Sequence, residues 1–243
     1  MRIIIIILSL SLVKVSMAQA KAKLISVEEM MTALNQVAQY YEGATTFRFD
    51  VYYASYKGHE SVTPYEESKG FILKSGTDYK SEIMGIKTVQ SDQYMVTVQP
   101  DGKQLILNNA QKAVNHGYSQ KEIEESLSKA TKIEKSVFGN SVTYLIHYKD
   151  VSPISYTEMK ISSQGYLEKI TFYYSQAAEW ESEEGEVRSS KPKLEMKYLN
   201  FQKNIAVEAK EFDLTQYIDI TQNQVKPSDR MKDYELIDVR IKK

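Results

Sequence analysis

The three histidines are the residues most suited to metal binding or general-base chemistry, and their spacing favours neither. The sequence contains His59, His116 and His147. None has another histidine or a carboxylate at the i+4 spacing of a helix or the i+2 spacing of a strand, so the sequence predicts no metal site. His147 shares a predicted strand face with Thr143 and Leu145, where a packed or solvated imidazole is expected.

One short motif has the spacing of a nucleophile and its base. Ser126-Leu127-Ser128-Lys129 matches the S-x-x-K pattern of serine acyl-transferring enzymes, in which the lysine takes the serine proton. The partner motifs S-D-N and K-T-G are missing, as are G-x-S-x-G, the P-loop, G-x-G-x-x-G and H-E-x-x-H. We interpret the motif as a solvated helix face and predict no catalytic residue, no cofactor and no enzymatic activity.

An acidic segment surrounds the single tryptophan. Trp180 lies among Glu179, Glu181, Glu183, Glu184 and Glu186. These residues lack the ligand spacing of a calcium loop, and a flexible segment would not hold two carboxylates at the fixed separation that glycoside hydrolysis needs. We expect a solvated loop from Glu179 to Lys191, with Trp180 as an exposed contact residue.

Tyrosine is the most abundant aromatic residue, with 18 copies against seven phenylalanines. Pairs such as Tyr40-Tyr41, Tyr52-Tyr53 and Tyr173-Tyr174 lie in predicted strands or at the ends of elements. Two interpretations stay open. Tyrosines could line a groove for sugars, peptides or acyl chains, or they could cover the half-wet face of an antiparallel sheet.

Composition narrows the class of protein. A chain of 243 residues with 42% hydrophobic and 26% charged residues is typical of a globular protein. The absence of cysteine excludes disulfides, thiolate zinc sites and cysteine nucleophiles. The formal net charge of −1 gives no clustered basic face, so no nucleic-acid partner is expected.

The first 20 residues have the three parts of an export signal. Met1-Arg2 gives a positive start, Ile3 to Val13 an apolar run, and Ala18-Gln19-Ala20 the small-x-small pattern of a cleavage site. The run is too short for a membrane span and Lys14 interrupts it. We predict a signal peptide over residues 1–20, cleavage after Ala20, and a periplasmic, monomeric protein with no membrane span, whose residues 21–243 form a single domain.

The element that follows the signal is predicted to be an amphipathic helix. Ser26 and Glu29 have the spacing of a capping box, and Gly43 ends the pattern. The apolar stripe is wide, so the helix must lie on a hydrophobic surface such as a sheet. Its members are Val27, Met30, Met31, Leu34, Val37, Ala38 and Tyr41.

From Thr45 the period of the apolar residues changes to two, which predicts antiparallel strands joined by tight turns. Turn signals stand at Pro100-Asp101-Gly102, Gly139-Asn140 and Ser163-Gln164-Gly165. After the first strand, which contains Phe47 to Tyr53, further strands are expected at Ser68–Lys74, Tyr79–Val89, Tyr94–Gln99, Gln104–Asn108, Thr131–Phe138, Val142–Tyr148, Tyr156–Ile161, Leu167–Ser175, Leu194–Phe201 and Leu236–Ile241.

These elements together define a fold class. We predict a mainly β protein with some α structure, in which a curled antiparallel meander of about ten strands forms an incomplete barrel. The N-terminal helix covers it, together with a shorter mid-chain helix that starts at a second capping box, Ser119 and Glu122, and reaches Ala130. Phe212 to Ile220 shows apolar alternation, and Tyr234 to Ile241 is expected to rejoin the sheet as an edge.

The order of these elements resembles the outer-membrane lipoprotein carrier family, the Lol fold, mainly over Val27 to Lys112. Leu34-Asn35-Gln36-Val37 followed by Phe47-Arg48-Phe49 is similar to that family's first helix and strand, and Gly70-Phe71-Ile72-Leu73-Lys74 to its glycine-led strand. Ser91-Asp92, or alternatively Asp101-Gly102-Lys103-Gln104-Leu105, is similar to its S-D-G-K-x-L signature. After Lys74 this chain has Ser75-Gly76, where the carriers have Arg-Pro.

The resemblance implies a cavity for acyl chains between the sheet and its covering helices. The lining would come from one face of the strands, with three helix residues above it. The predicted set is Met30, Met31 and Leu34 from the helix, and Phe47, Phe49, Val51, Phe71, Leu73, Ile83, Tyr94, Val96, Val98, Leu105 and Leu107 from the strands. The same residues could instead pack on each other, because alternation does not distinguish a filled core from a hollow one.

Two functions therefore stay open. The first is a non-enzymatic carrier or binding protein for an apolar ligand such as a lipid or a lipoprotein acyl chain. The second is a cell-envelope interaction module that binds another protein or a glycan through strand edges, tyrosines and Trp180. A carrier should have a contiguous apolar cavity under the N-terminal helix, whereas an interaction module should have a solid core and an exposed aromatic patch.

Overall fold

The computed structural model describes residues 22–91, 93–111, 120–182, 184–221 and 224–240, without the side chains of residues 120–123. The predicted signal peptide, His116 and the Ser119 cap lie outside the described residues.

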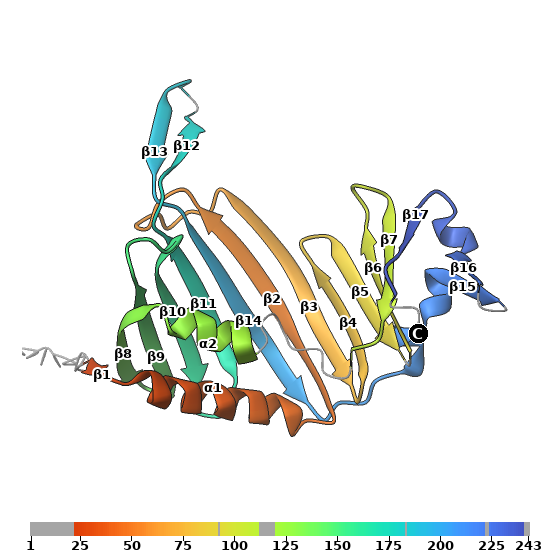
Figure 1. The fold of residues 1–243 in the computed structure, drawn as a ribbon, viewed down its shortest axis with the longest axis horizontal. Coiled ribbons are helices and arrows are strands. Elements are labelled where there is room, and N and C mark those ends of the chain that lie inside the picture. The colour runs from red at the N-terminus through yellow and green to blue at the C-terminus, as the bar shows by residue number, and fades with distance from the viewer. Residues whose placement is uncertain (1–21, 92, 112–119, 183, 222–223, 241–243) are drawn as a thin grey trace, which may run out of the picture.

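The fold is built on one open sheet of thirteen strands (Figure 1). Their spatial order is β1-β8-β9-β10-β11-β14-β2-β3-β4-β5-β6-β7-β17. The bounds are β1 (Lys23–Leu24), β2 (Thr46–Tyr56), β3 (Glu66–Ser75), β4 (Asp78–Ile83), β5 (Ile86–Ser91), β6 (Tyr94–Gln99), β7 (Gln104–Asn109), β8 (Ala130–Phe138), β9 (Ser141–Tyr148), β10 (Ile154–Ser162), β11 (Leu167–Tyr174), β14 (Lys193–Lys203) and β17 (Glu235–Asp238).

The predicted antiparallel meander is present, but it has more strands than expected. The three predicted hairpins join β6 to β7, β8 to β9 and β10 to β11. The segment Tyr79–Val89 was predicted as one strand and is two, because Met84 and Gly85 take positive φ angles of 50° and 77° and turn the chain between β4 and β5. The last strand, β17, does rejoin the sheet as an edge, although it pairs with β7 in parallel.

Helix α1 (Val27–Glu42) forms as predicted. The Ser26 side chain accepts a hydrogen bond from the Glu29 backbone, the Glu29 carboxylate accepts one from the Ser26 backbone, and Gly43 caps the C-terminal end. Figure 1 shows α1 running across the ends of the strands from β8 to β2. The second helix, α2 (Gln120–Leu127), is shorter than expected, because Ala130 already belongs to β8.

Segments outside the large sheet also depart from the predictions. The expected loop from Glu179 to Lys191 contains a hairpin of β12 (Ala178–Glu181) and β13 (Val187–Ser190), which projects from the sheet in Figure 1. The alternation from Phe212 to Ile220 does not form one strand. That region contains short helices η1 (Ala209–Phe212) and η2 (Leu214–Gln216) and then a hairpin of β15 (Ile218–Thr221) and β16 (Gln224–Pro227), followed by η3 (Asp229–Met231).

The sheet buries different faces in its two halves. We call the face toward α1 the inner face and the opposite one the outer face. On the inner face, Met30 of α1 packs with Leu127 of α2 and Ile146 of β9. On the outer face, Leu107 of β7 packs with Phe212 and Ile218 of the C-terminal segment. Both cores are anchored by side chains that are almost completely buried, each of which stabilises the fold by about 1.5–3 kcal/mol.

Candidate ligand-binding site

The first candidate site is an apolar surface on the inner face of β9, β10, β11, β14 and β2. Side chains that pair across antiparallel strands lie on the same face, so the register defines two continuous rows. We call these rows the inner floor. One row consists of Tyr144, Met159, Ile170, Met196 and Tyr53, and the next of Ile146, Thr157, Phe172 and Leu194.

Helix α1 lies above one end of the inner floor. Met30 is fully buried, while Met31, Leu34 and Val37 are partly exposed beside it. These residues pack with Tyr144, Ile146 and Met159 of the floor in a single cluster. Methionine and leucine on the helix therefore face methionine on the sheet, and flexible methionine side chains adapt to ligands of irregular shape.

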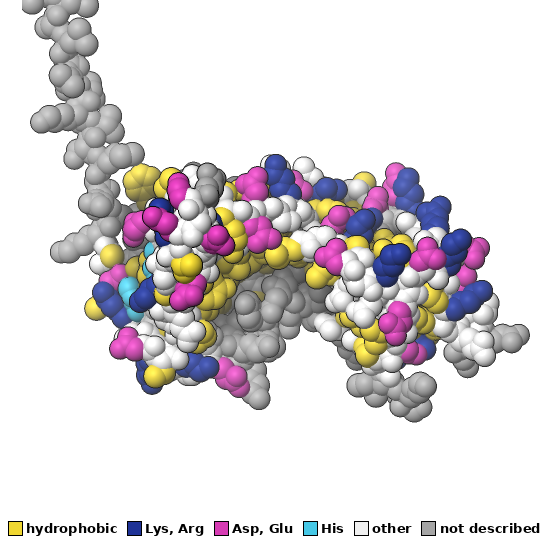
Figure 2. All heavy atoms as spheres, turned by 90° about the horizontal axis from the view of Figure 1, so that it is seen from above, with side chains coloured by type: hydrophobic (Ala, Val, Ile, Leu, Met, Phe, Trp, Pro, Cys, Tyr) yellow, Lys and Arg dark blue, Asp and Glu magenta, His cyan; other side chains and the backbone are white. Residues whose placement is uncertain are grey.

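Part of the inner floor is not covered by the protein's own described side chains. Phe172, Leu194 and Met196 are partly exposed, and they belong to none of the three buried clusters that the described residues form. Figure 2 shows the described part of the molecule as an arch, with hydrophobic side chains among those on its inner side. This exposed apolar area is the kind of surface that a lipid chain would bury.

The floor contains one polar group without a partner. Thr157 is 3% exposed, and its hydroxyl makes no hydrogen bond within the described part of the chain. Its neighbours across the strands are Ile146 and Phe172, which offer no hydrogen-bonding side chain. A buried hydroxyl without a partner is uncommon because its desolvation is not compensated.

The C-terminal end of α1 packs on the sheet through aromatic rings. Phe201 of β14 contacts the rings of Tyr40 and Tyr41 from α1 at 5.5 Å and 5.6 Å, and also those of Phe47 and Phe49 from β2. The hydroxyl oxygen of Tyr41 accepts a hydrogen bond from the Leu167 backbone at 3.2 Å. Burial raises the pKa of Tyr41 to about 12. These tyrosines hold the helix on the sheet.

The fourteen residues predicted to line the cavity divide between the two faces. Met30, Met31, Leu34, Phe47, Phe49, Val51 and Ile83 lie on the side of α1. Phe71, Leu73, Tyr94, Val96, Val98, Leu105 and Leu107 lie on the outer face, packed with the C-terminal segment. The expectation that one face carries them all is wrong, and whether any of them binds a ligand stays a prediction.

The register explains this division. Phe49 pairs with Ile72, so Phe71 and Leu73 must point to the opposite face. The apolar run Phe71-Ile72-Leu73 concealed this in the sequence, because both Ile72 and Leu73 are buried on their own faces. The partly exposed floor residues of β11 and β14 were missed, although the alternation of Ile170 with Phe172 and of Leu194 with Met196 was visible.

The outer face of the same strands is polar and internally paired. Lys169 lies 2.6 Å from Glu158, and Lys197 lies 2.9 Å from Glu195. Burial raises the pKa of Glu195, but the Lys197 hydrogen bond and the charges of Lys197 and Lys169 outweigh it, so this pKa lies below its usual value. The partly exposed Tyr52, Tyr156 and Tyr173 lie on this same face, as the second interpretation of the tyrosines expects.

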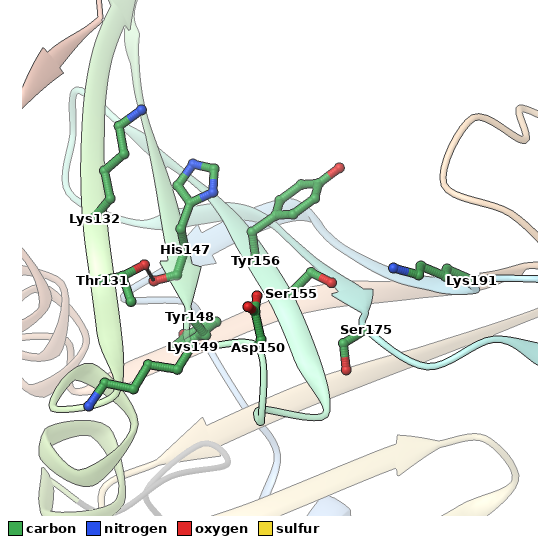
Figure 3. Close-up of a pocket in the computed structure, with 10 residues that line it drawn as sticks. All are labelled: Thr131, Lys132, His147, Tyr148, Lys149, Asp150, Ser155, Tyr156, Ser175 and Lys191. Atoms are coloured by element: carbon green, nitrogen blue, oxygen red, sulfur yellow. Dashed lines mark hydrogen bonds between the residues drawn. The ribbon is translucent and has the colours of Figure 1, made fainter.

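The second candidate site is a polar pocket of about 580 Å³ on the outer side, around the ends of β8, β9 and β10 (Figure 3). It is lined by Thr131, Lys132, His147, Tyr148, Lys149, Asp150, Ser155, Tyr156, Ser175 and Lys191. In Figure 3, Lys132 and Lys149 extend away from Asp150, and Lys191 extends toward Ser155. The hydroxyl of Ser175 donates to the Ser152 backbone at 2.5 Å, so it is already used.

The residues with possible chemistry do not converge. His147 Nε2 lies 3.7 Å from Glu134, but the described residues place no serine hydroxyl in hydrogen-bond contact with that imidazole. The Ser126 hydroxyl donates to the Tyr148 hydroxyl at 3.4 Å, and Lys129 lies in the hydrogen-bonded turn that follows the end of α2. Within the described ranges no group of three or more His, Asp or Glu could hold a metal ion.

Trp180 is not the exposed loop residue that the sequence predicted. It lies in β12 and is partly buried, because Lys57 covers its ring at 3.9 Å. Its indole nitrogen donates to the Ser190 hydroxyl at 3.2 Å, across the hairpin. These contacts stabilise the hairpin against the loop after β2.

Comparison with known proteins gives structural neighbours only. No family model and no curated protein sequence matches this chain. The fold is similar to an uncharacterized conserved protein from Thermus thermophilus (12% identity, 88% of this chain and 99% of that chain, TM-score 0.45). It is also similar to lipoprotein LppX from Mycobacterium tuberculosis (10%, 75% and 100%, TM-score 0.35) and to a LolA superfamily protein from Nitrosomonas europaea (11%, 78% and 98%, TM-score 0.31).

Among the described residues, no helix combines the length and the apolar character that crossing a bilayer requires.

Proposed function

We propose that residues 21–243 act as a single-domain, non-enzymatic binding protein or carrier for an apolar molecule such as a lipid or a lipoprotein acyl chain. The observation that carries this proposal is the partly exposed apolar group of Phe172, Leu194 and Met196 on the inner floor, which belongs to none of the buried clusters of the described residues. Binding would remove this apolar surface from water, which is the main driving force for holding a hydrocarbon chain.

The sequence supports a periplasmic location for this function. The predicted signal peptide and cleavage site would export the protein to the periplasm, where an apolar molecule needs a protein to cross the aqueous layer. We expect the mature chain to be a monomer. The alternative, an interaction module that uses Trp180, has less support because Lys57 and the hairpin already occupy that ring.

The test compares two leucines of the same strand. Leu194 belongs to the inner floor, whereas Leu199 pairs with Asp50 and is 45% exposed on β14. The binding of palmitic acid would be measured by native mass spectrometry and by displacement of a dansyl-labelled fatty acid. We expect Leu194→Glu to weaken binding by more than about tenfold, because a charge replaces buried apolar area.

Leu199→Glu is the control and should bind palmitic acid as the unmodified protein does. Circular dichroism and urea unfolding would show that both variants fold. A folded unmodified protein that takes up neither palmitic acid nor the dansyl probe would contradict the carrier function and leave the interaction module as the better account.

A further inference from the structure

The Thr157 hydroxyl has no hydrogen-bond partner among the described residues. This indicates which kind of apolar molecule the inner floor would bind. Thr157 occupies a row whose other members are Ile146, Phe172 and Leu194. A floor for a pure hydrocarbon would be stabilised by valine at this position, because valine has a similar shape and buries no hydroxyl. The unpartnered hydroxyl therefore destabilises the protein when no ligand is bound. A hydrogen bond to a ligand oxygen could offset this loss of stability.

The place of Thr157 also indicates which end of the ligand would reach it. Its cross-strand neighbour Ile146 packs with Leu127 of α2 and Met30 of α1 in one buried cluster. Thr157 thus lies at the helix-covered side of the floor, and Phe172 and Leu194 lead from it toward the partly exposed side. A long chain lying along this row would have one end at the hydroxyl and its remainder on the exposed apolar side chains.

We infer that the Thr157 hydroxyl donates a hydrogen bond to a carbonyl or carboxylate oxygen of the ligand, so that the acyl head lies under the helices and the hydrocarbon tail lies over Phe172 and Leu194. This inference rests on the proposed function, which it extends. It assigns the ligand to molecules that carry a carbonyl or carboxylate oxygen at one end of an alkyl chain, such as fatty acids and their small esters.

The structure supplies a matched control for this hydroxyl. Thr171 is 1% exposed, and its hydroxyl also lacks a partner among the described residues. It lies on the outer face, between Glu158 and Glu195 in the register. Thr157→Val and Thr171→Val therefore remove the same group from two buried positions on opposite sides of one sheet, and only the first faces the inner floor.

The experiment measures the binding of palmitic acid, methyl palmitate and hexadecane to the full mature protein and to both variants. We expect Thr157→Val to weaken the binding of palmitic acid and methyl palmitate about tenfold, which corresponds to about 1.4 kcal/mol, and to leave hexadecane unchanged. Thr171→Val should change none of the three. The infrared carbonyl band of bound methyl palmitate should shift to higher frequency in Thr157→Val, because the hydrogen bond is lost.

Two results separate the inference from the proposed function. If the acyl compounds bind to Thr157→Val as tightly as to the unmodified protein, with the carbonyl band unshifted, the assignment of the hydroxyl is wrong and the carrier function stands. If none of the three compounds binds to the unmodified, folded protein, the carrier function fails and the inference fails with it.

Discussion

The two halves of the sheet bury most of their apolar side chains on opposite faces. In the half formed by β8, β9, β10, β11, β14 and β2, the apolar side chains lie on the inner face beneath α1 and α2. In the half formed by β3 to β7, most of them lie on the outer face beneath the C-terminal segment, although Ile72 and Tyr79 still belong to the inner-face cluster around Phe47. The helix-covered half keeps Phe172, Leu194 and Met196 partly exposed, whereas the cluster around Leu107 is closed by Phe212 and Ile218. We therefore expect substitutions in the closed half to affect mainly stability, and substitutions on the partly exposed floor to affect mainly ligand binding.

The two halves meet between β2 and β3, and the next pair of strands, β3 and β4, approach each other closely at Gly70. A side chain at Gly70 would place its Cβ 2.0 Å from the Glu82 carbonyl oxygen. We predict that Gly70→Ala destabilises the protein by about 4 kcal/mol or prevents folding, since backbone atoms would have to move. Urea unfolding would measure this. Gly139→Ala is the control, because Gly139 has a φ of 57° but open space around it, and should cost only about 1 kcal/mol.

Truncation of Leu107 tests the closed half. This side chain is 0% exposed in the outer-face core, so Leu107→Ala should lower the free energy of unfolding by about 3 kcal/mol. In urea-free buffer, at a temperature where the variant is folded, its affinity for palmitic acid should not change. Leu194→Ala should show the reverse pattern, with a smaller stability loss and weaker binding. A loss of palmitate affinity in folded Leu107→Ala would mean that the two halves are coupled.

The two unpartnered threonines should report on stability in the same direction. Replacing a buried, unsatisfied hydroxyl by a methyl group removes its desolvation penalty. We therefore expect both Thr157→Val and Thr171→Val to raise the free energy of unfolding of the empty protein by about 1 kcal/mol, measured by urea unfolding. A destabilised Thr157→Val would indicate that its hydroxyl already has a partner in the folded chain.

The smallest effect concerns the polar outer face and its response to pH. The pKa of Glu195 is lowered in the folded protein, so its ionised form adds stability above the pKa of the unfolded chain. This contribution is lost as the pH falls through the folded-state pKa. Glu195→Gln should cost less than about 1 kcal/mol at neutral pH, and the difference from the unmodified protein should shrink in acid. Unfolding curves measured across the acidic range would check this, and a pH-independent difference would contradict it.

Local signals in the sequence predicted individual elements well. The capping box of Ser26 and Glu29, the stop at Gly43 and the hairpin turns are set by residues close together in the chain, so short patterns define them. Local patterns failed for Tyr79–Val89, which was predicted to be one strand but contains the turn between β4 and β5. Met84 has no turn preference, and only its neighbour Gly85 marks the turn between β4 and β5.

The candidate site was less predictable because it depends on register between strands. Alternation indicates which residues of one strand share a face, but not which faces of two strands coincide. The sequence could not show that Phe49 and Leu105 lie on opposite sides, since both are buried and apolar. It also could not show that Thr157 lies among Ile146 and Phe172, because those three residues come from three strands.

The first and last strands of the described chain cover the two edges of the sheet. At one border, β1 contributes only Lys23 and Leu24 beside β8, and at the other β17 contributes four residues beside β7. Both strands come from the ends of the described chain, and each occupies backbone groups that would otherwise be free to recruit another molecule. Beyond β1, the edge of β8 continues to Phe138, which is 61% exposed. Trimming either end would therefore promote self-association before it affected ligand binding, and a tag placed directly on β1 would disturb solubility more than one placed beyond a spacer.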